Sequence, residues 1–136
     1  REVGIRTVAY FMIGTPTERS RSDVVDTIKY SIKLDPDFVM FNLMTPFPGT
    51  TLFDEGIRDG VLDLEPWTNF MRNPDETFKA QVWDEYFTRE ELRDMLDMAY
   101  RRFYWRPKFV ARNLRQIRNP TDFKRKATAG LRLLTG

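Results

Sequence analysis

Two strongly apolar segments flank one helical segment near the start of the chain, and this arrangement restricts the fold more than any other feature. Residues 6–14 read RTVAYFMIG and residues 38–45 read FVMFNLMT, and both are rich in β-branched and aromatic residues. Between them, apolar residues recur at helical spacing from about Ser22 until Pro36 ends the pattern. A strand, a helix and a strand in succession predict a βαβ unit, whose strands are parallel and joined by a right-handed crossover.

The two predicted strands need partners. Each is apolar along nearly its whole length, so we expect both faces of the sheet to be buried. Unpaired edges in a buried sheet are unfavourable, and two strands are too few for an independently stable sheet. The chain starts with Arg1, and we expect the missing strands to precede that residue. Homo-oligomerisation through the unpaired strand edges is the alternative.

After the second strand the sequence predicts mainly helices. We expect a short helix around 52–58, then less regular structure over 61–87 with a short strand at 78–83. The capping box TREE at 88–91 begins a longer helix that runs to about Trp105, because its threonine and second glutamate satisfy the first backbone N–H groups.

Further helices are expected towards the end of the chain. Pro107 begins one in which three apolar residues face inward: Val110, Leu114 and Ile117. Thr121 is placed to cap a last one. We therefore divide the chain into an α/β part, residues 1–62, and a mainly helical extension, residues 63–136.

The sequence contains no cysteine and no histidine. Their absence excludes disulfides, thiolate or histidine metal sites and cysteine-ligated iron–sulfur clusters within this chain. It also excludes Ser-His and Cys-His nucleophilic pairs. Carboxylates, lysine, tyrosine, hydroxyl groups and backbone groups are what remains for chemistry in this chain. The lack of cysteine suits a cytoplasmic protein, and no apolar run is long enough to cross a bilayer.

Charge is distributed unevenly along the chain. Residues 1–100 hold 19 acidic and 11 basic residues, whereas residues 101–136 hold 11 basic residues and one aspartate. An alternative function therefore stays open, that of a non-catalytic α/β module whose basic C-terminal helices bind a partner, nucleic acid or a membrane surface. Solvation of the basic faces, or their docking onto the acidic part, explains the same pattern, so nucleic acid is the least expected partner. The basic residues concerned are Arg106, Lys108, Arg112, Arg115, Arg118, Lys124, Arg125, Lys126 and Arg132.

Both predicted strands end in loops that contain proline, at 14–18 and 45–49. In a parallel sheet these loops lie side by side at the carboxyl edge, where α/β proteins bind ligands. Gly14 would let a flat group approach the backbone closely, and the loop leads to a helix N-terminus, which favours an anion. Two well-formed turns without a ligand are the alternative.

These motifs resemble those of radical S-adenosylmethionine enzymes. Residues 10–18, YFMIGTPTE, are similar to the fifth-strand motif F-(I/M)-I-G-L-P-G-E-T, and residues 45–50, TPFPGT, are similar to the sixth-strand turn T-P-(Y/F)-P-G-T. That turn is typical of the cobalamin-binding branch, which includes the anaerobic magnesium-protoporphyrin monomethyl ester oxidative cyclases. Trp67 and the run AYRRFYWRP at 99–107 are also similar to this branch.

The resemblance implies a fold and a set of cofactors for the whole protein. The chain would be the C-terminal βαβ portion of a partial (β/α)6 TIM-like barrel, followed by an α-helical extension. The cofactors would be S-adenosylmethionine, a [4Fe–4S] cluster and, in this branch, cobalamin. The chain alone would bind none of them and be inert, because the cysteine loop C-x3-C-x2-C is absent from it.

The resemblance also implies a reaction class and partners. The whole protein would be an oxidoreductase, cyclase or methyltransferase acting on a small-molecule substrate. This chain would contribute the adenine edge of the S-adenosylmethionine site and part of the substrate pocket, and its first partner would be the missing N-terminal part of its own barrel.

Site residues follow from the same motifs. The residues that match the adenine-contacting positions are Met12, Ile13, Gly14, Met44 and Thr45. Glu18 matches the acidic position of the motif and is expected to be a structural cap. The sequence departs from the family pattern at Thr15, where leucine is usual, and at Thr17, where a second glycine is usual.

Asn42 is the polar residue of the second predicted strand. A polar side chain in a buried strand needs a partner, which is either a substrate or cofactor or a neighbouring strand. The methionines Met12 and Met40 would line a pocket or fill the core.

Overall fold

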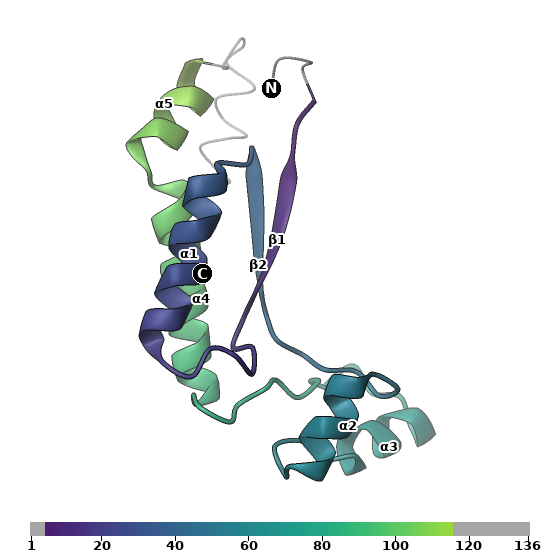
Figure 1. Ribbon diagram of the computed structural model, residues 1–136. Helices are drawn as coiled ribbons and strands as arrows, with labels where there is room; N and C mark the ends of the chain where they lie inside the picture. Colours follow the sequence, from purple (N-terminus) through teal and green to yellow (C-terminus); the bar gives the residue numbers. More distant parts are fainter. Residues whose placement is uncertain (1–4, 116–136) are drawn as a thin grey trace.

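The computed structural model describes residues 5–115. The predictions for residues 116–136, including the helix capped by Thr121 and the position of Ile117, lie outside that part. The described elements are, in order, β1 (Val8–Ile13), α1 (Arg21–Leu34), β2 (Phe38–Leu43), α2 (Thr51–Arg58), α3 (Glu65–Arg72), α4 (Arg89–Tyr104) and α5 (Pro107–Arg115). The two strands pair in parallel, with Val8 opposite Phe38 and Ile13 opposite Leu43, so the βαβ unit is confirmed (Figure 1).

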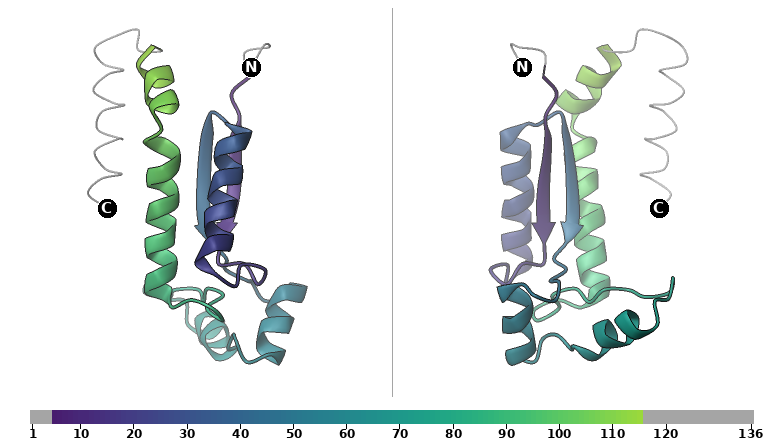
Figure 2. Two further views of the ribbon diagram at one scale, coloured as in Figure 1. Left: turned by 60° about the vertical axis from the view of Figure 1, so that its left-hand side comes forward. Right: turned by 90° about the vertical axis from the view of Figure 1, so that its right-hand side faces the viewer.

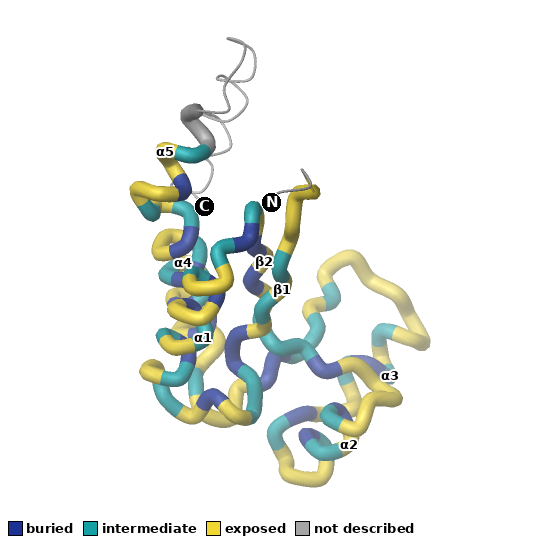
Figure 3. Tube along the Cα trace, turned by 45° about the horizontal axis from the view of Figure 1, so that its top comes forward, coloured by how far each residue is buried: buried dark blue, intermediate teal, exposed yellow. Residues whose placement is uncertain are grey.

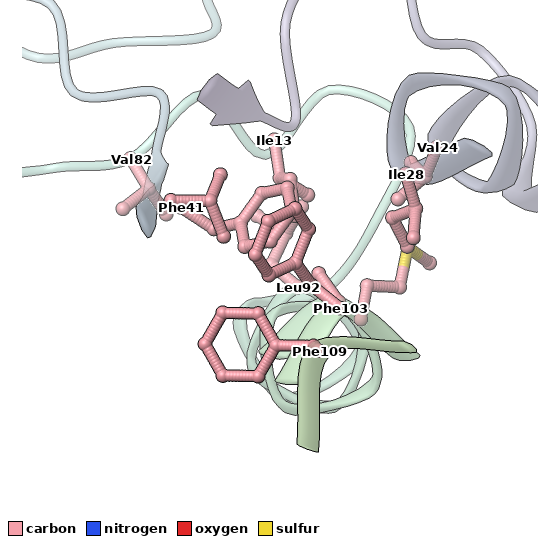
Figure 4. Close-up of a cluster of buried hydrophobic side chains, with 11 residues drawn as sticks. Ile13, Val24, Ile28, Phe41, Val82, Leu92, Phe103 and Phe109 are labelled. Carbon is pink, nitrogen blue, oxygen red and sulfur yellow. The ribbon is translucent and has the colours of Figure 1, made fainter. Parts of the chain in front are cut away.

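Both α1 and α4 lie on the same face of the sheet; in the right-hand view of Figure 2 the strands lie in front of both helices. Apolar side chains from the sheet and from the helices that cover it form one core (Figure 4). Its fully buried members include Ile13 and Phe41 from the sheet, Ile28 from α1, and Leu92 and Phe103 from α4. Burial of side chains of this size contributes about 1.5–3 kcal/mol each, which holds the helices on the sheet.

The other face of the sheet is not covered by any described residue, so the expectation that both faces are buried is wrong for this part of the chain. The strands alternate between inward and outward side chains, and the outward ones are exposed. Tyr10 is 70% exposed, Met12 55% and Met40 43%. We call this surface the bare face and define it by six residues: Val8, Tyr10, Met12, Phe38, Met40 and Asn42.

Helices α2 and α3 lie beyond the carboxyl ends of the strands (Figure 1). They share a second apolar cluster built on Phe53, Leu62, Trp67 and Trp83. Helix α3 was not predicted, and residues 78–83 do not form the expected strand; they follow an exposed loop at 73–77 (Figure 3). Isolated short helices are marginal in water, so burial of the aromatic side chains stabilises this unit.

The capping box at 88–91 is confirmed, since Thr88 accepts a hydrogen bond from the Glu91 backbone N–H, and Glu91 accepts one from that of Thr88. Helix α4 then ends at Tyr104, close to the predicted end.

Helix α5 begins at Pro107 as predicted, but it buries Phe109 and exposes Val110. The inward-facing position therefore differs by one residue from the prediction. Three basic residues at this end of the chain contact the carboxylate of Asp35, at the C-terminus of α1: Arg106 at 3.5 Å, Lys108 at 3.0 Å and Arg112 at 3.2 Å. These three are thus engaged within the chain, in line with docking of the basic segment onto the acidic part. Among residues 5–115 no helix is long and apolar enough to cross a membrane.

Candidate functional site

The two loops that follow the strands meet at the carboxyl edge of the sheet, as predicted. The backbone N–H of Met44 donates to the carbonyl of Ile13 at 2.8 Å and so extends the pairing by one residue. A later segment, residues 80–87, crosses the same edge, and the Trp83 N–H donates to the carbonyl of Met44 at 2.9 Å. Three segments that are distant in sequence are therefore tied together at this edge.

The first loop is organised by Glu18, which is 5% exposed. Its Oε2 accepts hydrogen bonds from the backbone N–H of Gly14 at 2.8 Å and of Thr15 at 3.2 Å. Its Oε1 accepts one from the Thr27 hydroxyl at 2.6 Å, which ties the loop to α1. Glu18 therefore acts as a structural cap of the loop, as expected from the sequence.

Gly14 adopts φ +77°, a conformation that glycine accepts without strain. A Cβ there would lie 2.7 Å from Cδ2 of Leu92, so the second requirement for glycine is close packing of the loop against α4. The approach of a flat ligand to this backbone stays a prediction.

The donors at this loop are already used within the chain. Glu18 occupies the N–H groups of Gly14 and Thr15, and the Asp23 carboxylate accepts from the N–H groups of Arg19 at 3.0 Å and Ser20 at 2.8 Å. The Ser20 hydroxyl also donates to this carboxylate, at 2.8 Å. That hydrogen bond first, and then the one from the Ser20 N–H, hold the pKa of Asp23 below its ordinary value. The sequence-based expectation of an anion at this helix N-terminus is thus met by the protein's own carboxylates.

The bare face meets the carboxyl edge at one pair of neighbouring residues. Met12 and Asn42 are opposite each other in the strand register, and both side chains project from the bare face. Asn42 is exposed, so its amide is available to a ligand without displacing a core side chain. An apolar sheet surface with one amide next to a loop edge can bind a flat apolar group and fix its orientation with a hydrogen bond.

The five residues matched to the cofactor-contacting positions have different environments. Met12 projects onto the bare face, whereas the side chain of Ile13 is fully buried between sheet and helices. Met44 packs against the second apolar cluster, and its backbone N–H and carbonyl are both hydrogen-bonded. The Thr45 hydroxyl donates to the carbonyl of Leu43 at 3.2 Å. Met12 is thus the matched residue whose side chain is free to contact a ligand, and the role of all five stays a prediction.

A metal centre has no basis in the part of the chain that is described. Residues 5–115 contain no cluster of three or more metal-binding side chains, and the full sequence contains neither cysteine nor histidine. The donor set does not fit an iron–sulfur cluster, which needs thiolate ligands.

Sequence reasoning missed two sets of contacts with the sheet, one at its carboxyl edge and one along the outer edge of β2. At the carboxyl edge, the hydrogen bond from Trp83 to Met44 has no signal in the sequence, which predicts only less regular structure over 61–87. Along β2, the hydroxyls of Tyr100 and Tyr104 bind the backbone of Phe41 and Val39. The sequence analysis used Tyr100 and Tyr104 only as part of the motif at 99–107. Their spacing of four residues would have predicted that both side chains lie on the same side of a helix.

Comparison with known proteins gives three similar sequences. The chain is 33% identical over 114 residues to an uncharacterized methyltransferase of Pyrococcus horikoshii, which covers 84% of this chain and 24% of that protein. It is 31% identical over 111 residues to the anaerobic magnesium-protoporphyrin IX monomethyl ester cyclase of Rubrivivax gelatinosus, covering 81% of the chain and 18% of the cyclase. The cyclase of the same description from Cereibacter sphaeroides is 35% identical over 106 residues, covering 76% and 16%.

The chain therefore spans about a quarter, or less, of the length of the curated relatives it matches. No protein-family model matches it, and no solved structure matches it. The similarity is to a methyltransferase and to cyclases, and it concerns one segment of each of these longer proteins.

Proposed function

We propose that this chain is the segment of a radical S-adenosylmethionine enzyme that forms one wall of the cofactor and substrate site. The observation that carries the proposal is the bare face, on which Met12 and Asn42 lie side by side at the carboxyl edge of the sheet. The similarity to a methyltransferase and to two cyclases supports the same class of enzyme. On this proposal the βαβ unit is the end of a partial α/β barrel, and the bare face lines its interior.

The chain's own residues bind and orient in this proposal; they perform no bond-breaking step. The Met12 side chain and the neighbouring backbone contact the adenine of S-adenosylmethionine, and the apolar bare face excludes water from the site. Asn42 donates or accepts a hydrogen bond that orients the cofactor or the substrate. When bound, S-adenosylmethionine supplies the carbon radical, whose generation requires redox groups held by polypeptide outside this chain.

The loop at 14–20 supports this role indirectly. Glu18 and Asp23 hold its backbone N–H groups, and Gly14 packs on Leu92, so the loop is rigid before any ligand arrives. A rigid edge reduces the ordering that binding would require.

The test uses the complete gene product that contains this chain and measures its dissociation constant for S-adenosylmethionine by calorimetry. Met12→Asp places a charge on the bare face and is expected to weaken binding at least about tenfold, since desolvating one charge exceeds 1.4 kcal/mol. Met71→Asp is the matched control, because Met71 lies on α3 and is 65% exposed. Unchanged affinity in Met12→Asp, with Met71→Asp also unchanged, would refute the proposal.

A further inference from the structure

The end of α4 carries two arginines and a tryptophan on its outer side. Arg101 and Arg102 are exposed, and neither forms an ion pair with a described residue. They precede Trp105 by four and three residues, and the Trp105 N–H still donates to the Arg101 carbonyl, so the three side chains lie on one side of the helix. Trp105 is 53% exposed, whereas Trp67 and Trp83 are buried. A large indole therefore lies at the surface beside two cations that no described carboxylate neutralises.

Helix α5 exposes an apolar side chain because contacts on its other side fix its orientation. Phe109 is buried, and the guanidinium carbon of Arg112 lies 5.3 Å from the centre of its ring. Arg112 also pairs with Asp35 at 3.2 Å. With Phe109 and Arg112 held inward, Val110 is 40% exposed. Helix α5 thus adds an exposed aliphatic side chain five residues after Trp105.

Charge is polarised between the two ends of the molecule. Residues 101–115 hold six basic residues and no acidic one, and three of the six share the single carboxylate of Asp35. Helices α2 and α3 lie at the opposite end from α5 (Figure 1). Residues 51–79, which include both of these helices, hold seven acidic and three basic residues. The end formed by α4 and α5 therefore attracts an anionic surface, and the other end does not.

An exposed indole, an aliphatic side chain and arginines without counter-ions fit the surface of an anionic lipid bilayer. Tryptophan is enriched at the level of lipid headgroups, because its ring is apolar and its N–H is polar. Basic side chains close to the surface are attracted to anionic lipids. Nucleic acid would also attract Arg101 and Arg102 and could stack on Trp105. Its phosphate backbone, however, offers no apolar layer for Val110, which favours the lipid surface.

We propose that the junction of α4 and α5 binds the surface of an anionic lipid bilayer. We call this the junction surface and define it by five residues: Arg101, Arg102, Trp105, Lys108 and Val110. Trp105 and Val110 enter the boundary between headgroups and acyl chains, and Arg101 and Arg102 contact the lipid phosphates. Helix α4 covers the face of the sheet opposite the bare face, so a bound membrane leaves the bare face open. The binding goes beyond the proposed function and does not depend on it.

The test measures co-sedimentation of the complete gene product with vesicles of phosphatidylcholine, alone or in an equal mixture with phosphatidylglycerol. We expect binding to the anionic vesicles, weakening as salt is added, because salt screens surface charges. Arg101→Glu combined with Arg102→Glu should weaken this binding at least about tenfold. The matched control is Arg72→Glu combined with Lys79→Glu, which changes the net charge equally at two exposed positions outside the junction surface. It should change the binding by less than about threefold.

Trp105→Ala separates entry into lipid from simple attraction of charges. It should weaken binding to the anionic vesicles by about fivefold or more, since less apolar surface is buried. A blue shift of tryptophan fluorescence on binding should disappear in the same variant.

Three outcomes would overturn the proposal. They are the absence of binding to anionic vesicles at low salt, an equal loss of binding in the two double variants, and unchanged binding in Trp105→Ala. Tighter binding to duplex DNA than to anionic vesicles would assign the junction surface to nucleic acid instead. None of these measurements involves S-adenosylmethionine, so failure of the proposed function would leave their results intact.

Discussion

The carboxylate of Glu18 holds the backbone N–H of Gly14 at 2.8 Å, four residues earlier in the chain, and this contact fixes the loop that follows β1. The same side chain also binds the Thr15 N–H and the Thr27 hydroxyl. One buried acidic residue thus connects the end of a strand, a turn and the helix that covers the sheet.

Replacement of Glu18 by alanine should therefore lower the free energy of unfolding by about 2–4 kcal/mol, because it leaves several buried donors without an acceptor. Glu18→Gln should lower it less, since an amide oxygen can still accept from one of them. Urea unfolding measures both, with Glu76→Ala as the control at an exposed position. Equal stability of Glu18→Ala and Glu76→Ala would show that the loop does not depend on this carboxylate.

Gly14→Ala should be more destabilising than Gly60→Ala. Both glycines have positive φ, +77° and +75°, so both substitutions incur the same backbone strain of roughly 1–2 kcal/mol. A Cβ at Gly60 meets nothing within 4 Å, whereas at Gly14 it would lie 2.7 Å from Leu92. Overpacking of this kind adds about 1–3 kcal/mol.

The comparison is made by thermal or urea unfolding of both variants, with Leu92→Ala combined with each. Leu92→Ala should be less harmful in the Gly14→Ala background than alone, because it removes the atom that the new methyl group meets. Strictly additive effects of the two substitutions would argue against the close contact.

Asp35 and its three basic neighbours hold α5 against the end of α1. Asp35→Asn preserves the shape of the side chain and the tolerance of its φ of +47°. It removes the charge that faces Arg106 and Arg112, whose side chains are 13% and 19% exposed. We expect a loss of about 1–3 kcal/mol in the free energy of unfolding.

Asp26→Asn is the matched control, because the Asp26–Lys29 pair is 69% exposed on both sides and should contribute at most about 0.5 kcal/mol. Urea unfolding at low and high salt separates the two cases. If Asp35→Asn were as mild as Asp26→Asn, the three basic residues would not depend on this carboxylate for their position.

The strands, their order and their parallel pairing followed from the sequence because periodicity and proline act locally. Phe41 and Ile13 lie in the core, as expected for residues of apolar strands. The bare face could not be predicted in the same way. Tyr10 and Met40 have the residue types of a core, but no described residue covers them. An apolar strand predicts that its face is buried, but it does not indicate which segment of polypeptide buries it.

The site followed the same division. The sequence assigned Met12 to the first strand and Asn42 to the second. Their position opposite each other depends on the strand register, which only the structure gives. The use of Gly14 for packing on Leu92 depends on a contact between residues far apart in the sequence. Such contacts have no local signal, so the sequence did not indicate that Gly14 packs against α4, and a ligand at its backbone stays a prediction.

Alkaline pH should destabilise the chain through Tyr104. Burial raises the pKa of its hydroxyl above the ordinary value of 10.0, with the nearby Tyr100 acting in the same direction and the hydrogen bond with the Val39 backbone opposing. A raised pKa in the folded state means that the neutral hydroxyl is favoured there. Its contribution to stability is therefore complete below the unfolded pKa and is lost as the pH rises through the folded pKa.

The free energy of unfolding should accordingly fall as the pH rises above 10.0, and the fall should be smaller in Tyr104→Phe, which has no proton to lose. Below that pH the phenylalanine variant should be the less stable of the two, since the Val39 backbone groups have lost their partner. Urea unfolding at stepped pH, with tyrosinate absorbance followed in parallel, measures both effects. Parallel pH profiles for the two proteins would mean that Tyr104 ionises as freely in the folded chain as in the unfolded one, and the hydroxyl would then not be held at the edge of β2.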